Sequence, residues 1–271
     1  MKADRLSNRQ IESYEHDGFL SPIEVMSEAD AVNFRRELEE VVASPAVDPK
    51  TDFRQLHLVR QWAYELIHHP GLLDAVEDLI GPDLLLWRTN CFIKGPNTAT
   101  FVSWHQDATY WRLEPPLGIT AWLALSPVDS ANGCVRAIPG SHKWGQIAHE
   151  DVASDVNLLS RGQTAKITID ESTAVDFVLR PGQMSLHDLF VLHGSAPNQA
   201  SYPRIGIGLI YLPPKVRQIG LRPGAVLVRG KDPYGNFSID PAPPADLARE
   251  AMEARSRSLA VQAAMLQPAK K

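Results

Sequence analysis

The chain has few of the residues that would indicate a secreted protein or a cysteine-rich metal site. It contains only two cysteines, Cys91 and Cys134, in 271 residues. Two cysteines do not make a disulfide framework, and neither lies in a cysteine cluster of the kind that binds zinc or iron–sulfur groups. The first residues also lack the apolar core of a secretory signal. We therefore expect a cytoplasmic protein.

Long apolar runs and an excess of basic residues are also missing. No segment approaches the ~18 apolar residues that a membrane span requires. The net charge is −5, with 27 Lys and Arg against 32 Asp and Glu. A nucleic-acid-binding protein would instead carry a basic face. We expect neither a membrane nor a nucleic acid as partner, and the sequence leaves the oligomeric state open.

Capping motifs and apolar spacing predict helices at both ends of the chain. Ser7 with Gln10 forms a capping box, and Ser27 with Asp30 opens a second helix. The predicted helices cover residues 7–17, 27–43, 70–80 and 244–266.

The middle of the chain reads as a series of short strands. They are predicted over residues 84–94, 101–111, 120–128, 182–192, 204–212 and 226–228. Strands without intervening helices favour an antiparallel sandwich over a βαβ sheet. We predict a single domain, 1–271, with N-terminal helices over about 7–81, a β core over about 84–228 and a C-terminal helix over about 244–266.

One predicted strand, 101–111, carries an H-x-D pair. His105 and Asp107 are two residues apart, and residues at this spacing in a strand point to the same face. The imidazole and the carboxylate should therefore lie side by side. An isolated H-x-D pair is a weak signal, because most such pairs are chance polar neighbours on a strand.

Downstream residues strengthen the signal. His193 is followed after eleven residues by Arg204. Two histidines and one carboxylate on one face of Fe(II) leave three positions open, which is the facial triad of non-heme iron oxygenases. An arginine suits the far carboxylate of a 2-oxo diacid, because its planar fork binds both oxygens.

These motifs resemble the phytanoyl-CoA dioxygenase (PhyH) family of Fe(II)- and 2-oxoglutarate-dependent oxygenases. The resemblance covers roughly residues 5–215 and rests on segments 7–20, 132–135, 138–143 and 193–204 in the family's order. It implies a mainly β fold with flanking helices around a double-stranded β-helix, a cupin-like jelly roll. It also implies Fe(II), 2-oxoglutarate and O2 as cofactor and cosubstrates, with His105, Asp107 and His193 as metal ligands and catalytic residues.

The resemblance extends to the cosubstrate. It implies that Arg204 and Ser195 bind the far carboxylate and that Trp122 flanks it, although a core tryptophan is almost as good an interpretation. Lys94 and Asn90 alternate on one face of strand 84–94 and are further candidates for contact with the cosubstrate, or else lie on a solvated sheet face.

A second histidine, His187, competes for the role of third ligand. It lies six residues before His193, so the two would share a face of an unbroken strand. The family spacing of Gly194, Ser195 and Arg204 favours His193. His187 is then a residue beside the metal or the substrate, or a structural histidine.

The substrate is open. Candidate substrate residues are Arg88, Tyr110, Trp111, Arg112 and His187. An anion-binding lining would use Arg54, His57, Arg60, Arg88 and Arg112, whereas an aromatic pocket would use Trp62, Tyr64, Tyr110 and Trp111.

The expected reaction is oxidation, most simply hydroxylation, of a C–H bond in a small molecule, with release of succinate and CO2. Related halogenases have Gly or Ala in place of Asp107, so its presence favours oxygenation. Two alternatives remain at this point. A zinc-type hydrolase with the same ligands would leave Arg204 unexplained, and a catalytically silent jelly-roll binding protein would need neither the triad nor the arginine.

Overall fold

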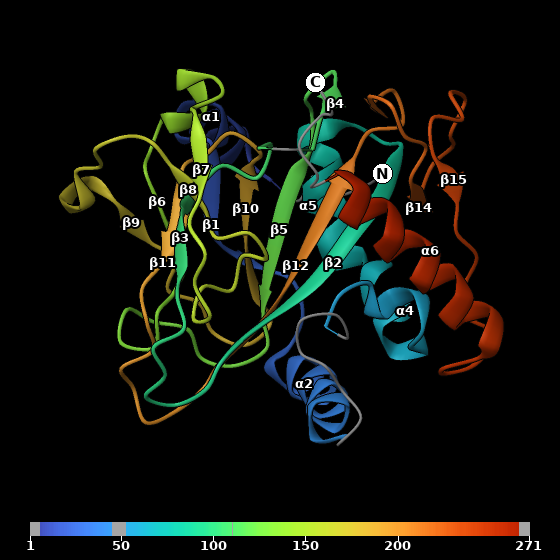
Figure 1. The fold of residues 1–271 in the computed structure, drawn as a ribbon, viewed down its shortest axis with the longest axis horizontal. Helices are drawn as coiled ribbons and strands as arrows, with labels where there is room; N and C mark the ends of the chain where they lie inside the picture. The colour runs from blue at the N-terminus through green and yellow to red at the C-terminus, as the bar shows by residue number, and fades with distance from the viewer. Residues whose placement is uncertain (1–5, 45–52, 110, 266–271) are drawn as a thin grey trace.

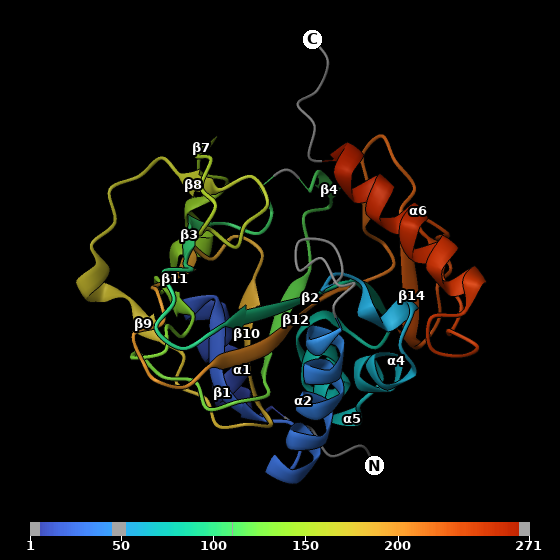
Figure 2. The same ribbon diagram turned by 60° about the horizontal axis from the view of Figure 1, so that its bottom comes forward.

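The computed structural model describes residues 6–44, 53–109 and 111–265. Helices cover one side of a large sheet, and a smaller sheet lies toward its other side (Figure 1). A rotated view shows α2, α4 and α5 grouped beside β2 and β12, well away from β3 and β11 (Figure 2). Within the described ranges, no helix is both long enough and apolar enough to cross a membrane.

Both predicted N-terminal caps are present. The Ser7 hydroxyl accepts a hydrogen bond from the Gln10 amide while the Gln10 side chain accepts one from the Ser7 amide. The Ser27 hydroxyl accepts one from the Asp30 amide. The helices are α1 (Asn8–Asp17), α2 (Glu28–Ala43), α4 (Gln61–Ile67), α5 (Pro70–Ile80) and α6 (Arg249–Met265), with 3-10 turns η1 (Leu56–Leu58), η2 (Ser141–Trp144) and η3 (Glu171–Thr173).

The larger sheet has seven strands. In spatial order they are β1 (Phe19–Glu24), β10 (Gln183–Asp188), β5 (Ile119–Ala124), β12 (Arg204–Leu212), β2 (Leu84–Lys94), β14 (Gly224–Arg229) and β15 (Ser238–Ile239). All neighbours pair antiparallel except β14 with β15.

The smaller sheet has four strands, in the order β3 (Val102–His105), β11 (His193–Ser195), β6 (Arg136–Ala137) and β9 (Val175–Asp176). Two ribbons complete the β structure, β4 (Leu113–Glu114) with β13 (Arg217–Gln218) and β7 (His149–Asp151) with β8 (Gln163–Ala165). Two antiparallel sheets with helices packed outside confirm the predicted mainly β, jelly-roll fold.

Because side chains alternate along each strand, the two faces of the large sheet differ: one is apolar and the other carries polar residues. One face packs on the helices and joins their core through Cys91, Ile119, Ala121, Leu123, Ile205, Ile207 and Leu209. The opposite face carries Arg88, Asn90, Phe92, Lys94, Trp122 and Arg204. Gly206 allows the close approach on this face, because a Cβ there would lie 2.3 Å from Trp122 ring atoms. The polar residues of β2 and β12 therefore face the interior between the sheets.

Three predicted strands end earlier than expected, and the one predicted over 120–128 ends at Ala124. The other two end where the chain changes sheet. The strand predicted over 101–111 ends at His105, and the one predicted over 182–192 ends at Asp188. In both places a turn follows, and the chain crosses from one sheet toward the other. The sequence-based prediction also missed α4, whose apolar residues Trp62, Ala63, Leu66 and Ile67 are buried.

Candidate metal centre and cosubstrate pocket

Strand pairing in the smaller sheet brings the two predicted histidine ligands together. His105 ends β3, His193 begins β11, and the two residues are partners in the ladder. The Asp107 Oδ1 atom lies 3.6 Å from His105 Nε2 and 4.0 Å from His193 Nε2. Donor atoms of all three residues lie within 4.8 Å of one another, close enough to hold one metal ion.

The prediction that His105 and Asp107 lie on one face of the same strand is wrong. Asp107 does not continue the strand but lies in the turn that follows β3. Its carboxylate is brought to the histidines by this turn and by contacts with the larger sheet. The H-x-D spacing predicted the neighbours correctly, whereas the extended backbone at Asp107 was not confirmed.

Backbone carbonyls orient both imidazoles. His105 Nδ1 lies 2.9 Å from the Ser103 carbonyl oxygen, and His193 Nδ1 lies 3.0 Å from that of Val191. A proton on Nδ1 donates to the carbonyl and leaves the Nε2 lone pair free for a metal. Burial first, and then the neighbouring His105 and His187, hold the pKa of His193 well below its usual value. A neutral imidazole is the form that binds a metal.

The second carboxylate oxygen of Asp107 is bound by the larger sheet. Thr120 on β5 donates to Oδ2 at 2.6 Å, and His187 Nε2 on β10 lies 3.3 Å from the same atom. Burial alone would raise the pKa of Asp107, but the neighbouring His105, His187 and His193 side chains hold it well below its usual value. The ionised carboxylate therefore has Oδ2 occupied and Oδ1 turned toward the histidines.

We expect Thr120→Val to weaken metal binding without unfolding the protein. Valine keeps the volume and β-branching of threonine but removes the hydrogen bond that fixes Asp107. Loss of such an outer partner typically lowers metal affinity roughly 10- to 100-fold. Titration with a divalent metal would measure the change, and Thr98→Val, which removes a hydroxyl bonded to the Gly95 carbonyl, is the control. Equal affinity in the Thr120→Val and Thr98→Val proteins would contradict this role.

Gln106, between the two ligands in sequence, anchors the turn. Its amide nitrogen donates to the carbonyls of Gly145 and Phe190 at 2.9 and 2.8 Å, and its amide oxygen accepts from the Ile147 amide at 2.8 Å. The side chain is 1% exposed. Nothing in the local sequence signals this role, because the partners lie about 40 and 80 residues away.

A second polar cluster lies beyond the triad. Arg204 and Lys94 are partners across β12 and β2. The Lys94 Nζ atom donates to Ser195 Oγ at 2.6 Å and also to the carbonyls of Gly133 and Ala196. Arg204 donates to the Gly133 carbonyl at 2.7 Å, its Nε has no partner, and its guanidinium lies 5.2 Å from the Trp122 ring.

This cluster holds two buried basic side chains. Lys94 and Arg204 are 0% and 1% exposed, and among the described residues no carboxylate forms an ion pair with either. Burial first, and then Arg204, lower the pKa of Lys94 to about 6, so at neutral pH Lys94 is largely uncharged until an anion binds beside it. Burial lowers the pKa of Arg204 only to about 10, so Arg204 stays charged. Buried charge is costly unless it is paired. A carboxylate of 2-oxoglutarate supplies the missing anion, so the donor set fits this cosubstrate.

A cavity of about 70 Å³ connects the triad with Arg204. Its lining residues are Phe92, Val102, His105, Asp107, Thr120, Trp122, Val135, Leu159, His187, His193, Gly194, Ser195 and Arg204. Ser195 and Trp122, which the sequence predicted to contact the cosubstrate, both line this cavity together with Arg204. Phe92, Thr120 and Leu159 were not predicted.

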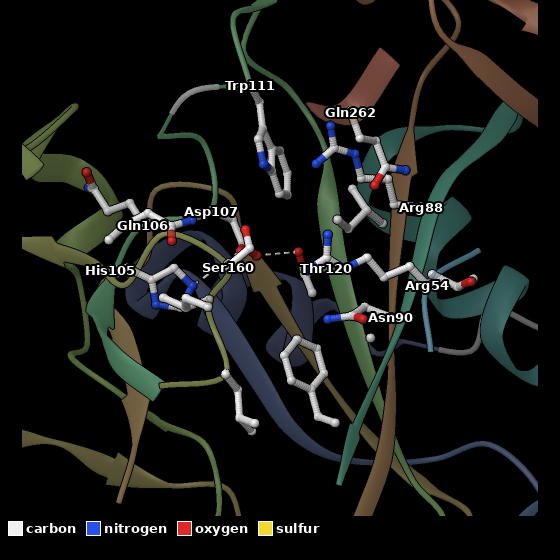
Figure 3. A pocket seen from close by; sticks show the side chains of 17 residues that line it. Arg54, Arg88, Asn90, His105, Gln106, Asp107, Trp111, Thr120, Ser160 and Gln262 are labelled. Carbon is white, nitrogen blue, oxygen red and sulfur yellow. Dashed lines mark hydrogen bonds and ion pairs between the residues drawn. The ribbon is translucent and has the colours of Figure 1, made fainter. Parts of the chain in front are cut away.

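A larger cavity of about 140 Å³ shares the His105 and Asp107 side but extends toward β2 and α6 (Figure 3). Its polar and aromatic lining includes Arg54, Arg88, Asn90, Gln106, Trp111, Thr120, Ser160, Gln163 and Gln262. Asn90 was predicted beside the cosubstrate, but it lines this cavity rather than the one that contains Arg204. Arg88 and Trp111, predicted as candidate substrate residues, line this cavity.

The other candidate substrate residues do not line the larger cavity in the described part of the chain. His187 contacts Asp107 and lines the smaller cavity. Arg112 is exposed and lines a separate pocket with Pro116 and Gln146, so the structure does not bring it to the metal site. Tyr110 lies outside the described residues.

The two linings considered for the substrate are each realised only in part. His57 is buried and bonds Thr89, and burial lowers its pKa to about 3. Arg60 pairs with Asp246. Trp62 is in the helix-side core, and Tyr64 packs against that core. From the two sets, the cavity retains Arg54, Arg88 and Trp111 among the described residues.

Comparison with known proteins agrees with this site. The family described as "Phytanoyl-CoA dioxygenase (PhyH)" matches residues 14–206. The ectoine dioxygenase of Streptomyces avermitilis is 23% identical over 74% of this chain and 77% of its own length. The peroxisomal phytanoyl-CoA dioxygenase of Bos taurus is 28% identical over 72% of this chain and 65% of its own length.

Solved structures show the same fold. The non-heme monooxygenase ThoJ, in its apo form, superposes with a TM-score of 0.84 at 33% identity and covers 94% of this chain and 96% of its own. CytC3 with Fe(II) and alpha-ketoglutarate superposes with a TM-score of 0.69 at 23% identity, covering 91% and 97%. The family match spans both the triad pair and Arg204, and the triad geometry supports it. The chain therefore belongs to the phytanoyl-CoA dioxygenase (PhyH) family and is an Fe(II)- and 2-oxoglutarate-dependent oxygenase.

Proposed function

We propose that this enzyme hydroxylates a C–H bond of a small molecule bound in the larger cavity. His105, Asp107 and His193 would hold the iron, and Arg204 with Lys94 and Ser195 would hold the far carboxylate of 2-oxoglutarate. The observation that carries the proposal is the arrangement of two cavities on either side of one ligand set, with His105 and Asp107 lining both. Bound Fe(II) with 2-oxoglutarate supplies the oxidising power from O2 and releases succinate and CO2.

The protein's own contribution is position and charge. Carbonyls of Ser103 and Val191 fix the imidazoles, and Thr120 and His187 fix the carboxylate. The two buried basic side chains hold the cosubstrate at one end, so that its other end meets the metal ligands. The larger cavity then presents the substrate to the same ligands from the other side, and its aromatic and aliphatic walls limit access of water.

The test is coupled turnover. A panel of candidate substrates, incubated with Fe(II), 2-oxoglutarate and O2, should show one compound that stimulates succinate release and gains one oxygen atom. The product is analysed by mass spectrometry, and a reaction under 18O2 shows whether the added oxygen atom comes from O2. A product that gains no oxygen while succinate is released would contradict hydroxylation and favour desaturation or ring formation. Hydrolysis of a candidate substrate without consumption of 2-oxoglutarate would instead favour the hydrolase alternative.

Asp107→Gly should abolish hydroxylation. The carboxylate neutralises part of the metal charge and occupies the position that a halide would need, so its removal weakens the site and opens that position. We expect loss of product by at least roughly 100-fold, since a metal ligand is removed. Reactions with and without chloride, read by product mass, measure the outcome. A wild-type product that contains chlorine would overturn the hydroxylase assignment.

A further inference from the structure

We propose that the substrate carries an oxyanion, a carboxylate or a phosphate, and that Arg88 and Arg54 bind it in the larger cavity. The inference rests on the proposed function for the identity of this cavity as the substrate site. It is distinct from cosubstrate binding, because Arg204 lines the smaller cavity and neither Arg54 nor Arg88 does. In the close view, the side chains of Arg54 and Arg88 enter from the side opposite His105 and Asp107 (Figure 3).

Two tryptophans fix the plane of Arg88. Its guanidinium carbon lies 3.9 Å from the Trp87 ring centre and 5.5 Å from that of Trp111. The two rings are 5.2 Å apart in an edge-to-face arrangement. Such stacking occupies the face of the guanidinium and leaves the N–H donors on its edge free. A planar fork held in this way is prepared for a carboxylate or a phosphate, which it binds through two parallel hydrogen bonds.

The donors of Arg88 have no strong acceptor among residues 6–44, 53–109 and 111–265. Its Nη2 lies 3.5 Å from the Met265 sulfur, a weak acceptor, and its buried Nε has no partner. In the described part of the chain no carboxylate forms an ion pair with Arg88. Burial, and then Arg54, lower the pKa of Arg88 to about 9. The guanidinium therefore stays charged near neutral pH, and it has no ion-pair partner in the part of the chain that the structure describes.

A second guanidinium faces the same space. Arg54 pairs with Asn90 in an isolated β-bridge, which places it beside the polar face of β2. Of the described lining residues only Asp107 is acidic, and its oxygens are directed to Thr120, His187 and the metal ligands. Two cations in a cavity without a free acid create a site for an anion.

The arginine end of the cavity is built partly outside the family match, which ends at residue 206. Helix α6 contributes Gln262 to the lining and Met265 to the contact with Arg88. The triad, Arg204, Arg54 and Arg88 fall inside the matched residues. Helix α6 lies against this end of the cavity (Figure 3).

The experiment compares matched probes on the enzyme loaded with Zn(II) and saturating 2-oxoglutarate, so that the Arg204 pocket is filled. Ligand-observed NMR measures dissociation constants of benzoate, phenyl phosphate and benzyl alcohol. We expect both anions to bind more tightly than the alcohol. Arg88→Gln should reduce this preference roughly 10- to 100-fold, the effect of a charge-assisted hydrogen bond, and Arg88→Lys should retain part of it. Arg54→Gln should also reduce it.

Arg180→Gln is the control, because Arg180 is an exposed arginine paired with Glu24. Retention of 2-oxoglutarate affinity shows that each variant is folded. The relative affinity of benzoate and phenyl phosphate identifies which oxyanion the site prefers, and either order supports the proposal. If Arg88 only packed between the tryptophans, Arg88→Gln would lower the melting temperature and leave the preference for anions unchanged.

Three results would overturn the proposal: equal binding of anions and alcohol to the wild type, binding of none of the probes, or an anion preference that survives in both Arg88→Gln and Arg54→Gln. Failure of the proposed function is read separately. It would appear as absence of 2-oxoglutarate binding in the same wild-type protein. The probes would then be measured on Arg204→Ala, so that they cannot bind in the Arg204 pocket instead.

Discussion

His193→Ala is expected to abolish both iron binding and turnover, whereas His187→Ala should retain the metal. His193 Nε2 faces Asp107 Oδ1, while its Nδ1 is engaged with the Val191 carbonyl. His187 instead contacts Oδ2, the oxygen that Thr120 also binds. Removing a ligand eliminates one of three metal bonds, and removing an outer partner lowers affinity only roughly 10- to 100-fold.

Metal content after anaerobic reconstitution, followed by titration with Fe(II), measures the difference. Succinate formation is recorded on the same samples. His57→Ala is a suitable control, because this buried histidine bonds Thr89 and does not line either cavity of the site. Metal lost in His187→Ala but retained in His193→Ala would show that the third ligand is assigned to the wrong residue.

Much of this site could be predicted because its parts are short motifs with a chemical reason. The pair His105 and Asp107, the distal His193 and the arginine eleven residues later all define local chemistry. The strand from Arg204 to Leu212 was predicted with its observed bounds, since its apolar residues alternate with glycines on the interior face. Caps at Ser7 and Ser27 likewise determine where two helices begin.

What the sequence did not reveal depends on contacts between distant segments. In the sequence, Thr120 looks like any threonine of a strand. Its role depends on the fold, which places β5 opposite the turn that carries Asp107. The chain passes from one sheet to the other after His105 and after Asp188. Side-chain alternation does not show where this happens, so both strands were predicted too long. Asn90 shares a face with Lys94, but Asn90 lines the larger cavity, whereas Lys94 lines neither cavity and bonds Ser195 instead. The single-domain organisation and the cytoplasmic location stay predictions.

Arg204→Ala is expected to weaken 2-oxoglutarate binding by about one to three decades. The loss of one partner from a buried charged pair costs about 2–5 kcal/mol, because the other charge remains buried without its counterion. Arg204 is 1% exposed and has a single hydrogen bond, to the Gly133 carbonyl, so most of its donors are available to a ligand. Calorimetric titration of the anaerobic Fe(II) enzyme with 2-oxoglutarate measures the affinity.

Arg204→Lys separates charge from geometry. An ammonium keeps the positive charge but cannot form two parallel hydrogen bonds, so we expect only partial recovery. Arg217→Ala, which removes an exposed arginine paired with Glu114, is the matched control and should bind 2-oxoglutarate like the wild type. Unchanged affinity in Arg204→Ala would exclude the arginine from this role. Lys94, the second buried basic side chain and the donor to Ser195, would then have to hold the carboxylate alone, and Lys94→Met would be the variant that loses the cosubstrate.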